Sequence, residues 1–387
     1  MFQARYLSNC IMFGKSKLWL IAAGMISNVI CASTAVVYPE GEGIGAGKHI
    51  VFLASDHEYR AEETCPALAR VLSKHHGFKC TVVFGVGEDG CIEAGSSNVE
   101  GLSALRSADA AVIFARFLDL PDHEMAELDG YLQRGGPIVG LRTSSHAFLI
   151  DAPATYEKYD FESSTPGFEK GFGHQILGNT WVGHYGANHR QATRITLAEG
   201  KEAHPILRGV KSGAYCYAGA YRAEVADDFE VLAYSQPMES MEKDAPVLES
   251  KPPQATSWTR HYAAKDGSLH RVFHSTQGAS EDILDDDYRR MMVNGIIWAA
   301  GLEDQITDSL EMGLVGDYQP NTFGVLQHSR NTKPSDLAGF DGPVVLKGTE
   351  HKPDASKFRE SDMRMQDKMM PRFVPNYVPH KDRVNKK

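Results

Sequence analysis

Four stretches of the chain place polar side chains directly after a short apolar run. The run PIVGL is followed by RTSSH, which contains Arg142, Ser144 and His146, and the run HIVFLA is followed by SDHEYRAEE. A third run, AAVIFA, leads into Arg116, and a late run, RVFHST, leads into Gln277. In an open parallel sheet the carboxyl ends of the strands share one edge, where ligands bind. The four stretches therefore predict a single site.

The residue types in these stretches suit acid–base chemistry on an oxygen-rich ligand. Glu58 and His146 are our candidates for moving protons, because burial past a strand end shifts carboxyl and imidazole groups toward the protonation that catalysis needs. Each such residue taken alone has a structural alternative, since a strand-end arginine often pairs with a carboxylate and serines often cap helices. We assign substrate binding to Arg60, Arg116, Arg142, Ser144, His189 and Gln277.

A second group of histidines lies in the segment GHQILGNTWVGHYGANHR, at His174, His184 and His189. Their spacings do not match a helical metal-binding pair of the HExxH type. In the folded chain His184 could still join His57 in a divalent metal site, zinc being the natural choice for such ligands. Satisfied loop histidines are the alternative. The sequence therefore gives His57 and His184 only as optional metal ligands.

A nucleophile of the elbow type is missing. In doubly wound hydrolases and amidotransferases a Gly-x-Ser-x-Gly or Gly-x-Cys-x-Gly run presents the nucleophile at a sharp turn. The corresponding run here begins at Gly140 and places Arg142 where the nucleophile would stand, and arginine cannot act as one. A pair of Ser144 with His146 is conceivable, although such a pair more often caps a helix. No phosphate-binding glycine pattern follows HIVFLA, which argues against nucleotide binding.

The elements that must position these residues alternate along the first half of the chain. Strands separated by helices of ten to fifteen residues imply right-handed crossovers, a mostly parallel sheet and helices on both faces. The fold class is therefore α/β and doubly wound. The periodicity predicts strands over 49–54, 79–84, 110–115 and 137–141, and helices over 64–77 and 121–136.

The second half of the chain is less regular. Residues 151–190 are rich in Gly, aromatic and His residues, which indicates long ordered loops. Residues 303–387 mix Pro, Gly, Met and charges without a sustained period and are predicted to form an irregular C-terminal extension, either a loosely attached tail or one held by its aromatic side chains. The remaining predicted elements are strands over 192–198, 229–234, 254–260 and 270–276 and a helix over 285–302.

Composition limits the partners. The 387 residues are 42% hydrophobic, enough for a large core, and the formal net charge is −10. Such a charge does not attract nucleic acid or an acidic membrane surface, so a small neutral or anionic ligand is the better expectation. A homo-oligomer stays open. Of the six cysteines, Cys80 and Cys91 are the plausible local disulfide, with unpaired buried thiols as the equal alternative.

The first 35 residues have the layout of a secretory signal. Lys15 and Lys17 precede the apolar run LWLIAAGMISNVI, and small residues follow in ICASTA, which predicts cleavage near Ala32 or Ala35. We therefore expect an exported protein, periplasmic or extracellular. The run is shorter than a membrane-spanning helix requires, which disfavours a retained anchor. A lipoprotein modified at Cys31 is disfavoured because Ile30 is bulky.

The strand-end motifs and the histidine-rich segment described above resemble those of the trehalose-utilisation (ThuA-like) family. The resemblance rests on the strand ending in DHEYR, on GGPIVGLR with its following histidine, and on ILGNTWVGHYGANH leading to ITLAEGKEAHPILRGV. It also rests on RVFHSTQG and on DDYRRMMVNGIIWAAGL. It covers about 46–302, two thirds of the chain, and the final helix and HPILRGV are its more specific parts.

The resemblance implies a flavodoxin-like core, similar to class I glutamine amidotransferases, and a role in sugar catabolism. Many relatives carry a histidine after the glycine of the late strand-end motif, where this chain has Ala279, and another at the position of Arg142. A metal or acid–base role that depends on those two histidines does not carry over. His57, His146 and His184 stand at positions that remain compatible with such a role.

These observations lead to three hypotheses. The first is an exported ThuA-like enzyme of carbohydrate catabolism that acts on a sugar or keto-sugar by acid–base, optionally metal-assisted, chemistry: a hydrolase, lyase or isomerase rather than an amidotransferase. The second is a non-catalytic carbohydrate-binding module. The third is an assembly protein whose partner binds residues 303–387.

Overall fold

The computed structural model describes residues 34–93, 95–325, 327–329 and 331–345, together with Asp367, Val378 and Pro379, and only the backbone at 223 and 225. Structural statements below refer to these residues. Most of the predicted signal, residues 1–33, lies outside them, as do Phe358, Phe373 and Tyr377 of the extension. Thr34 and Ala35 of the predicted signal are described, and Ala35 begins the first strand.

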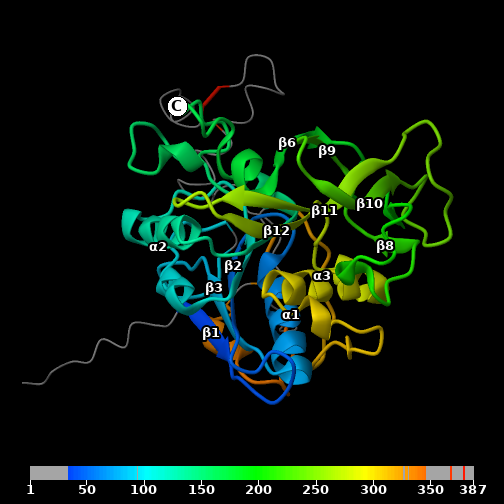
Figure 1. Cartoon of the computed structure of the whole chain (residues 1–387), viewed down its shortest axis with the longest axis horizontal. Helices are drawn as coiled ribbons and strands as arrows, with labels where there is room; N and C mark the ends of the chain where they lie inside the picture. The colour runs from blue at the N-terminus through cyan, green and yellow to red at the C-terminus, as the bar shows by residue number, and fades with distance from the viewer. Residues whose placement is uncertain are drawn as a thin grey trace, which may run out of the picture. The chain divides into compact units, whose positions relative to one another are not determined.

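A ten-stranded sheet forms the centre of the molecule (Figure 1). Its middle consists of five parallel strands in the order β3-β2-β4-β5-β12, which in chain order is 2-1-3-4-5. The five parallel strands are β2 (His49–Ser55), β3 (Lys79–Phe84), β4 (Ala110–Ala115), β5 (Ile138–Leu141) and β12 (Leu269–Ser275). Their apolar runs are buried on both faces, as parallel sheets require.

Antiparallel strands extend this middle on both sides, so the sheet is mixed. β1 (Ala35–Tyr38) pairs with β3, and on the other side β12 is followed by β11, β10, β7 and β8. The late runs predicted as strands do form strands, but beyond β12 their direction alternates. The bounds of the outer strands are β7 Thr193–Leu197, β8 Ala214–Cys216, β10 Glu230–Pro237 and β11 Gln254–Ala263; β6 (Asn179–His184) and β9 (Tyr221–Val225) form a separate pair.

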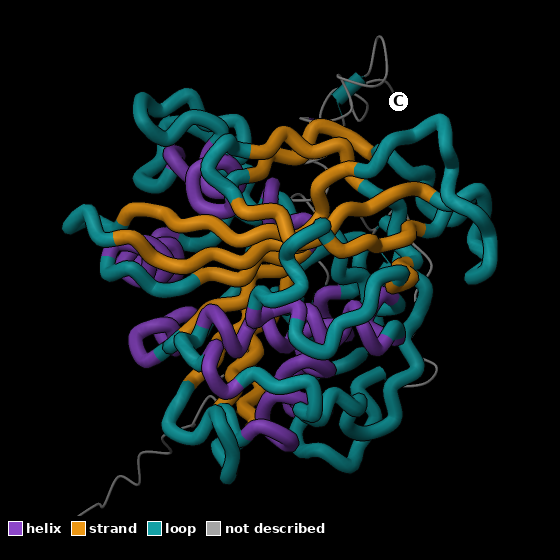
Figure 2. Tube along the Cα trace, turned by 45° about the vertical axis from the view of Figure 1, so that its right-hand side comes forward, coloured by secondary structure: helices purple, strands orange, loops and turns teal. Residues whose placement is uncertain are grey.

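Helices cover both faces of the sheet. Alternate residues of each central strand enter two separate cores: Ile50 and Phe52 face α1 (Ala61–His76) and α3 (Asp286–Ala299), whereas Val51 and Leu53 face α2 (Asp122–Gln133). This alternation is the period of two that a strand imposes on its side chains. Figure 2 shows the strands running between helices. The predicted three-layer α/β arrangement is therefore present.

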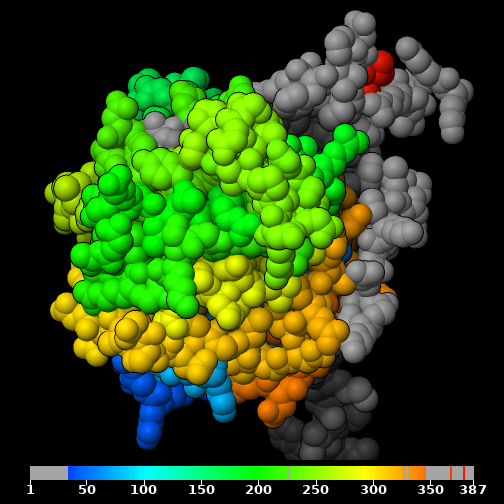
Figure 3. All heavy atoms as spheres, turned by 90° about the vertical axis from the view of Figure 1, so that its right-hand side faces the viewer, coloured from blue at the N-terminus to red at the C-terminus, as the bar shows by residue number. Residues whose placement is uncertain are grey.

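The first part of the C-terminal extension is packed on the domain, which corrects the expectation of a loosely attached tail for residues 303–345. The segment has only short 3-10 turns, at Glu303–Gln305 and Pro334–Leu337, yet it buries Met312, Tyr318 and Phe323. In Figure 3 its gold-to-orange surface lies between the green surface of the middle of the chain and the blue surface of the first elements. Its aromatic side chains hold it there, as the second reading of the sequence expected.

Two further sequence expectations concern cysteines and the membrane. The thiols are free at the four described cysteines, Cys65, Cys80, Cys91 and Cys216. The prediction of a disulfide between Cys80 and Cys91 is therefore wrong. Within the described residues, no helix has the length and apolar character needed to cross a bilayer.

Candidate functional site

The carboxyl ends of β2, β4 and β5 bring together the charged residues that the sequence placed after them. A carboxylate oxygen of Glu58, from the loop after β2, forms an ion pair with the Arg116 guanidinium at the end of β4. The backbone N–H of Phe117, next to Arg116, donates to the carbonyl of His146, from the 3-10 helix Arg142–His146 after β5 (3.0 Å). The order of the strands reverses between β2 and β4, the usual place for a ligand in such a sheet.

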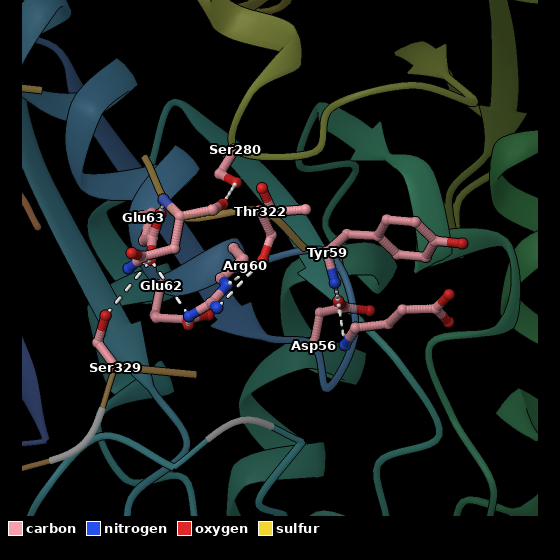
Figure 4. Close-up of polar contacts among 10 residues, drawn as sticks. Asp56, Tyr59, Arg60, Glu62, Glu63, Ser280, Thr322 and Ser329 are labelled. Carbon is pink, nitrogen blue, oxygen red and sulfur yellow. Dashed lines mark hydrogen bonds and ion pairs between the residues drawn. The ribbon is translucent and has the colours of Figure 1, made fainter. Parts of the chain in front are cut away.

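Asp56 fixes the loop after β2. One of its carboxylate oxygens accepts from the backbone N–H of Glu58 (2.9 Å) and of Tyr59, and the other accepts from the hydroxyl of Thr143 at 2.7 Å. Figure 4 shows Asp56 reaching back to the backbone of Tyr59. The carboxylate therefore ties the loop of Glu58 to the helix of His146.

Glu58 is an anion in this setting. Burial works to raise the pKa of Glu58, but the Arg116 guanidinium, helped by that of Arg142, outweighs it, so the pKa lies below its usual range. The amide of Asn188 donates to the other Glu58 oxygen at 3.2 Å. A carboxylate held by a guanidinium and an amide is oriented and charged at neutral pH.

Arg142 is stacked between two tyrosines. Its guanidinium carbon lies 4.1 Å from the ring centroid of Tyr59 and 3.9 Å from that of Tyr221, and it donates to the Thr276 carbonyl (2.8 Å) and the Gln277 side-chain oxygen (3.1 Å). The φ of Arg142 is 44°, the left-handed conformation of a sharp strand-to-helix turn. These contacts hold the guanidinium in place. The hydrogen bond between Arg142 and Gln277 satisfies part of the hydrogen-bonding capacity of each side chain.

Two buried histidines of the cluster carry nitrogens without a hydrogen-bond partner. His146 uses Nδ1 to contact the Ser145 hydroxyl at 3.0 Å, and its Nε2 has no partner; neither ring nitrogen of His57 has one. Burial, with the nearby Arg116 charge, lowers the pKa of both imidazoles well below the usual range, so both rings are neutral. Unpartnered polar atoms in a buried site are free to meet a ligand or water.

His184 connects this cluster to the surface. Its Nε2 lies 3.0 Å from the Tyr59 hydroxyl, and the residue is exposed. Burial of the part of the ring that faces the protein lowers the pKa of His184, and the positive charge of Arg142 lowers it further. A neutral imidazole at this position can exchange a proton with the Tyr59 hydroxyl and with solvent.

Arg60, His189 and Ser144, which were also predicted to bind substrate, differ in their surroundings. Arg60 turns away from the Glu58–Arg116 pair: its guanidinium donates to the carbonyl of Thr322 (3.1 Å from Nη2) and toward Glu63 (3.4 Å), as Figure 4 shows. His189 is exposed and stacks on Phe323, 4.7 Å between ring centroids. The Ser144 hydroxyl is buried and unpartnered.

The predicted metal ligands do not form a ligand set. Among the described side chains, no three His, Cys, Asp or Glu residues gather in a way that could hold a metal ion. Glu58, the carboxylate beside His184, is already bound to Arg116. A zinc site at His57 and His184 would therefore lack the third protein ligand that catalytic zinc sites have.

Four residues of the cluster were missed as site residues by sequence reasoning. Tyr59 and Tyr221 enclose Arg142; Asn188 donates to Glu58 and, at 2.9 Å, to Tyr59; the ring of Trp181 lies 5.1 Å from that of His146. The density of aromatic residues in residues 151–190 was the available signal for Trp181 alone. Arginine between aromatic rings is a recurrent pairing, but sequence spacing does not announce it.

Comparisons with known proteins give a limited picture. No protein-family model and no curated protein matches the chain. Among solved structures, a protein named ThuA-like from Bacteroides uniformis is 15% identical with a TM-score of 0.43, covering 68% of this chain and 95% of its own. Another so named, from Parabacteroides merdae, is 14% identical with a TM-score of 0.41, covering 72% and 96%. A β-galactosidase from a Rahnella species is 11% identical with a TM-score of 0.38, covering 67% and 31%.

Proposed function

We propose that the chain is an exported ThuA-like protein of carbohydrate catabolism, with a flavodoxin-like core, that acts on a sugar or keto-sugar by acid–base chemistry. The observation that carries the proposal is the Glu58–Arg116 pair at the switch point of the sheet, beside the unpartnered Nε2 of His146. The strand order 2-1-3-4-5 is the flavodoxin-like order, which supports the fold part of the proposal. Export rests on the signal-like first 35 residues.

The geometry assigns a role to each group. Glu58, held as an anion, takes a proton from the carbon beside a carbonyl; the electron pair of that C–H bond forms a C=C bond, and the π pair of the carbonyl moves onto its oxygen. Arg116, whose Nε has no hydrogen-bond partner, stabilises the oxygen as negative charge develops. His146 carries protons at Nε2, and His184 exchanges them with solvent. Return of the proton gives isomerisation, and loss of a neighbouring leaving group gives elimination.

Arg142 has a positioning role in this proposal. Its charge reaches the cluster, but its guanidinium is fixed by two rings and by two oxygen acceptors. Arg60 is left out of the substrate contacts because Thr322 and Glu63 occupy it.

Turnover of a panel of keto-glycosides and their parent sugars tests the proposal. We expect Glu58→Gln and His146→Ala each to reduce kcat at least 100-fold, the scale of general acid–base catalysis. Glu58→Gln leaves Arg116 without its counter-charge, so the double variant Glu58→Gln/Arg116→Gln and circular dichroism separate misfolding from lost chemistry. Glu62→Gln, which replaces a nearby carboxyl outside the cluster by an amide, is the matched control. If the folded Glu58→Gln and His146→Ala variants turn over the panel as the parent does, the proposed enzymatic function is excluded.

One observation favours the second candidate, a non-catalytic carbohydrate-binding module. Arg142 stands in the strained turn where related folds carry a nucleophile. Under this alternative the panel sugars bind without reaction, and Glu58→Gln weakens binding instead of turnover.

A further inference from the structure

Residues 318–325, which we call the lid, cross the loop of Glu58. The structure describes this whole stretch, and none of it is helix or strand. The Gly324 N–H donates to the Glu58 carbonyl at 2.8 Å, and the Phe323 ring lies 5.1 Å from the ring of Tyr59. The Glu58 side chain is buried, so a ligand reaches it only if part of its cover moves. Segments that move on binding come from the least stable parts of a fold, and a stretch without regular secondary structure is a candidate.

Three side chains of the domain hold the backbone of the lid. Arg60 donates to the Thr322 carbonyl from Nε (3.2 Å) and Nη2 (3.1 Å), and the Ser280 hydroxyl donates to the Asn321 carbonyl at 2.9 Å. Glu63 accepts from the Asn321 N–H at 2.9 Å. In Figure 4 Thr322 lies between Arg60 and Ser280. Water can replace these polar contacts when the lid lifts.

Glu281 lies under the same part of the lid. Its carboxylate accepts from the Thr322 hydroxyl (3.3 Å) and from the Phe323 N–H, and both donors favour the ionised form. Burial, followed by the charge of Asp282 and to a smaller extent that of Glu63, outweighs them and raises the pKa of Glu281 to about 7. Below this pH the closed lid therefore keeps a proton on a carboxyl that water would ionise at an ordinary pKa of about 4.5.

Acidic and neutral groups face Glu281 from three elements. They are Asp282, its neighbour in the chain, Glu63 of α1, and Tyr215 and Tyr217 in and just after β8. Burial raises the pKa of both tyrosines, so their hydroxyls are neutral. Arg60, the cation that anchors the lid, pairs with Glu63. An ionised Glu281 is therefore more stable once the lid has lifted and water reaches the carboxylate.

This difference links the position of the lid to pH. The closed lid holds the Glu281 proton more tightly than a water-exposed Glu281 does, so opening releases a proton between about pH 4.5 and pH 7. The equilibrium constant for opening therefore rises with pH through this window, by up to about tenfold per pH unit, and levels off above it.

We propose that residues 318–325 are a pH-sensitive lid, closed over the Glu58 loop while Glu281 holds its proton and loosened when Glu281 is ionised. Lifting the lid breaks the contact of Gly324 with the Glu58 carbonyl and takes the Phe323 ring away from Tyr59. The candidate site is then covered in acid and more accessible at neutral pH. The effect on turnover rests on the proposed function; the movement of the lid does not.

Hydrogen–deuterium exchange of the full-length protein, read by mass spectrometry over residues 318–325, tests the lid. Protection is the ratio of the intrinsic to the observed exchange rate, so the chemical effect of pH cancels. For the parent, the protection of these amides should fall about 10- to 40-fold between pH 5 and pH 7. Glu281→Gln keeps an oxygen for both lid donors but cannot ionise, so its protection should stay near the parent's pH 5 value at both pH values. Thr322→Val, which removes one donor, should lower protection about 2- to 5-fold at each pH.

Two references separate the lid from other effects of pH. The peptide of β4, residues 110–115, reports global unfolding and should keep a protection well above that of the lid. Glu202→Gln, at an exposed carboxyl, should keep the parent's pH dependence. If the lid and β4 exchange together, or if Glu281→Gln loses protection with pH as the parent does, the lid is excluded. If Glu281→Gln holds its protection while Glu58→Gln keeps turnover, the lid stands and the proposed chemistry fails.

Discussion

Glu62 and Glu63 share one guanidinium at the first turn of α1. Nη1 of Arg60 lies 3.4 Å from a carboxylate oxygen of Glu63 and 4.0 Å from one of Glu62. Glu63 also accepts from the backbone and side chain of Asn321, each at 2.9 Å, whereas the Glu62 oxygen nearest Arg60 accepts no hydrogen bond. Burial, followed by the charge of Glu63, raises the pKa of Glu62 to about 8. Glu62 therefore holds a proton that the unfolded chain releases.

The raised pKa of Glu62 predicts a stability that falls as pH rises. Between about pH 4.5 and pH 8 the folded state binds a proton that the unfolded state lacks, so the unfolding free energy decreases through this window. Glu62→Gln, a permanently neutral amide, should remove the decrease and gain about 1–3 kcal/mol at pH 8 relative to the parent. Urea unfolding at pH 5 and pH 8 measures it, with the exposed Glu202→Gln as control. Equal slopes for parent and Glu62→Gln would contradict the assignment.

The buried imidazoles predict a second pH effect. His57 and His146 should stay neutral at pH 6, where a free imidazole is mostly protonated, because burial and Arg116 lower the pKa of each. Nitrogen-15 NMR of histidine-labelled protein between pH 8 and pH 5 reports the protonation of each ring. His146→Gln identifies the His146 signals. A His146 ring that becomes charged above pH 6 would rule out the buried placement.

At the scale of elements, two glycines in helices give opposite predictions. A Cβ on Gly295 of α3 would lie 2.2 Å from the Phe273 ring of β12, so Gly295→Ala should cost about 1–3 kcal/mol through overpacking. Gly130 of α2 is exposed with no neighbouring atom within 4 Å of such a Cβ, so Gly130→Ala should gain about 0.5–1 kcal/mol. Thermal unfolding of the pair measures both signs. If Gly295→Ala left the thermal stability unchanged, α3 would not be closely packed against β12 at this position.

The sequence predicted the central strands well because their apolar runs are buried on both sides. It did not predict the antiparallel extension, since β11 and β12 look like any other half-buried strands. The signal was the turn at Asp266 and Gly267, where the φ of the glycine is 82° and the strands reverse. The N–H of Gly267 donates to the Ala264 carbonyl and that of Ala264 to the Ser268 carbonyl, and a three-residue turn that ends in a left-handed glycine is a common hairpin connection.

The candidate site was predictable where a residue directly follows a strand. Glu58, Arg116 and His146 lie together because three parallel strands end at one edge. Arg60 comes two residues after Glu58 but has a φ of 63° and immediately precedes α1, so its side chain leaves the site. Tyr221 and Asn188 come from segments without periodicity, and only the folded chain brings them to Glu58 and Arg142.

At the scale of the whole molecule, the segment 303–345 behaves as part of the domain. The Tyr38 hydroxyl donates to the Leu337 carbonyl at 2.9 Å, and Arg70 donates to the Leu337 and Gly342 carbonyls. The Gly324 N–H donates to the carbonyl of Glu58 at 2.8 Å. The first strand, the first helix and the site loop all depend on it.

Truncation tests this dependence. A chain that ends at Leu302 exposes the surface on which Ile306, Met312, Tyr318, Phe323 and Leu337 are buried. At about 1.5–3 kcal/mol for each large apolar side chain, the loss is comparable with the whole stability of a domain. We expect this chain to be insoluble or unfolded by circular dichroism. A chain that ends at Val345 keeps all these contacts and is the control. A 302-residue chain with the parent's melting temperature would restore the hypothesis of a tail that serves only a partner.

The contact between Thr322 and Arg60 has a consequence for the newly made protein. The two residues are 262 positions apart, so the ribosome synthesises the Glu58 loop long before the segment that covers it. At about 5–20 residues per second, the loop waits roughly 13–50 seconds for its cover. A nascent chain therefore carries an uncovered Glu58 loop until residue 322 has been made and can reach Arg60.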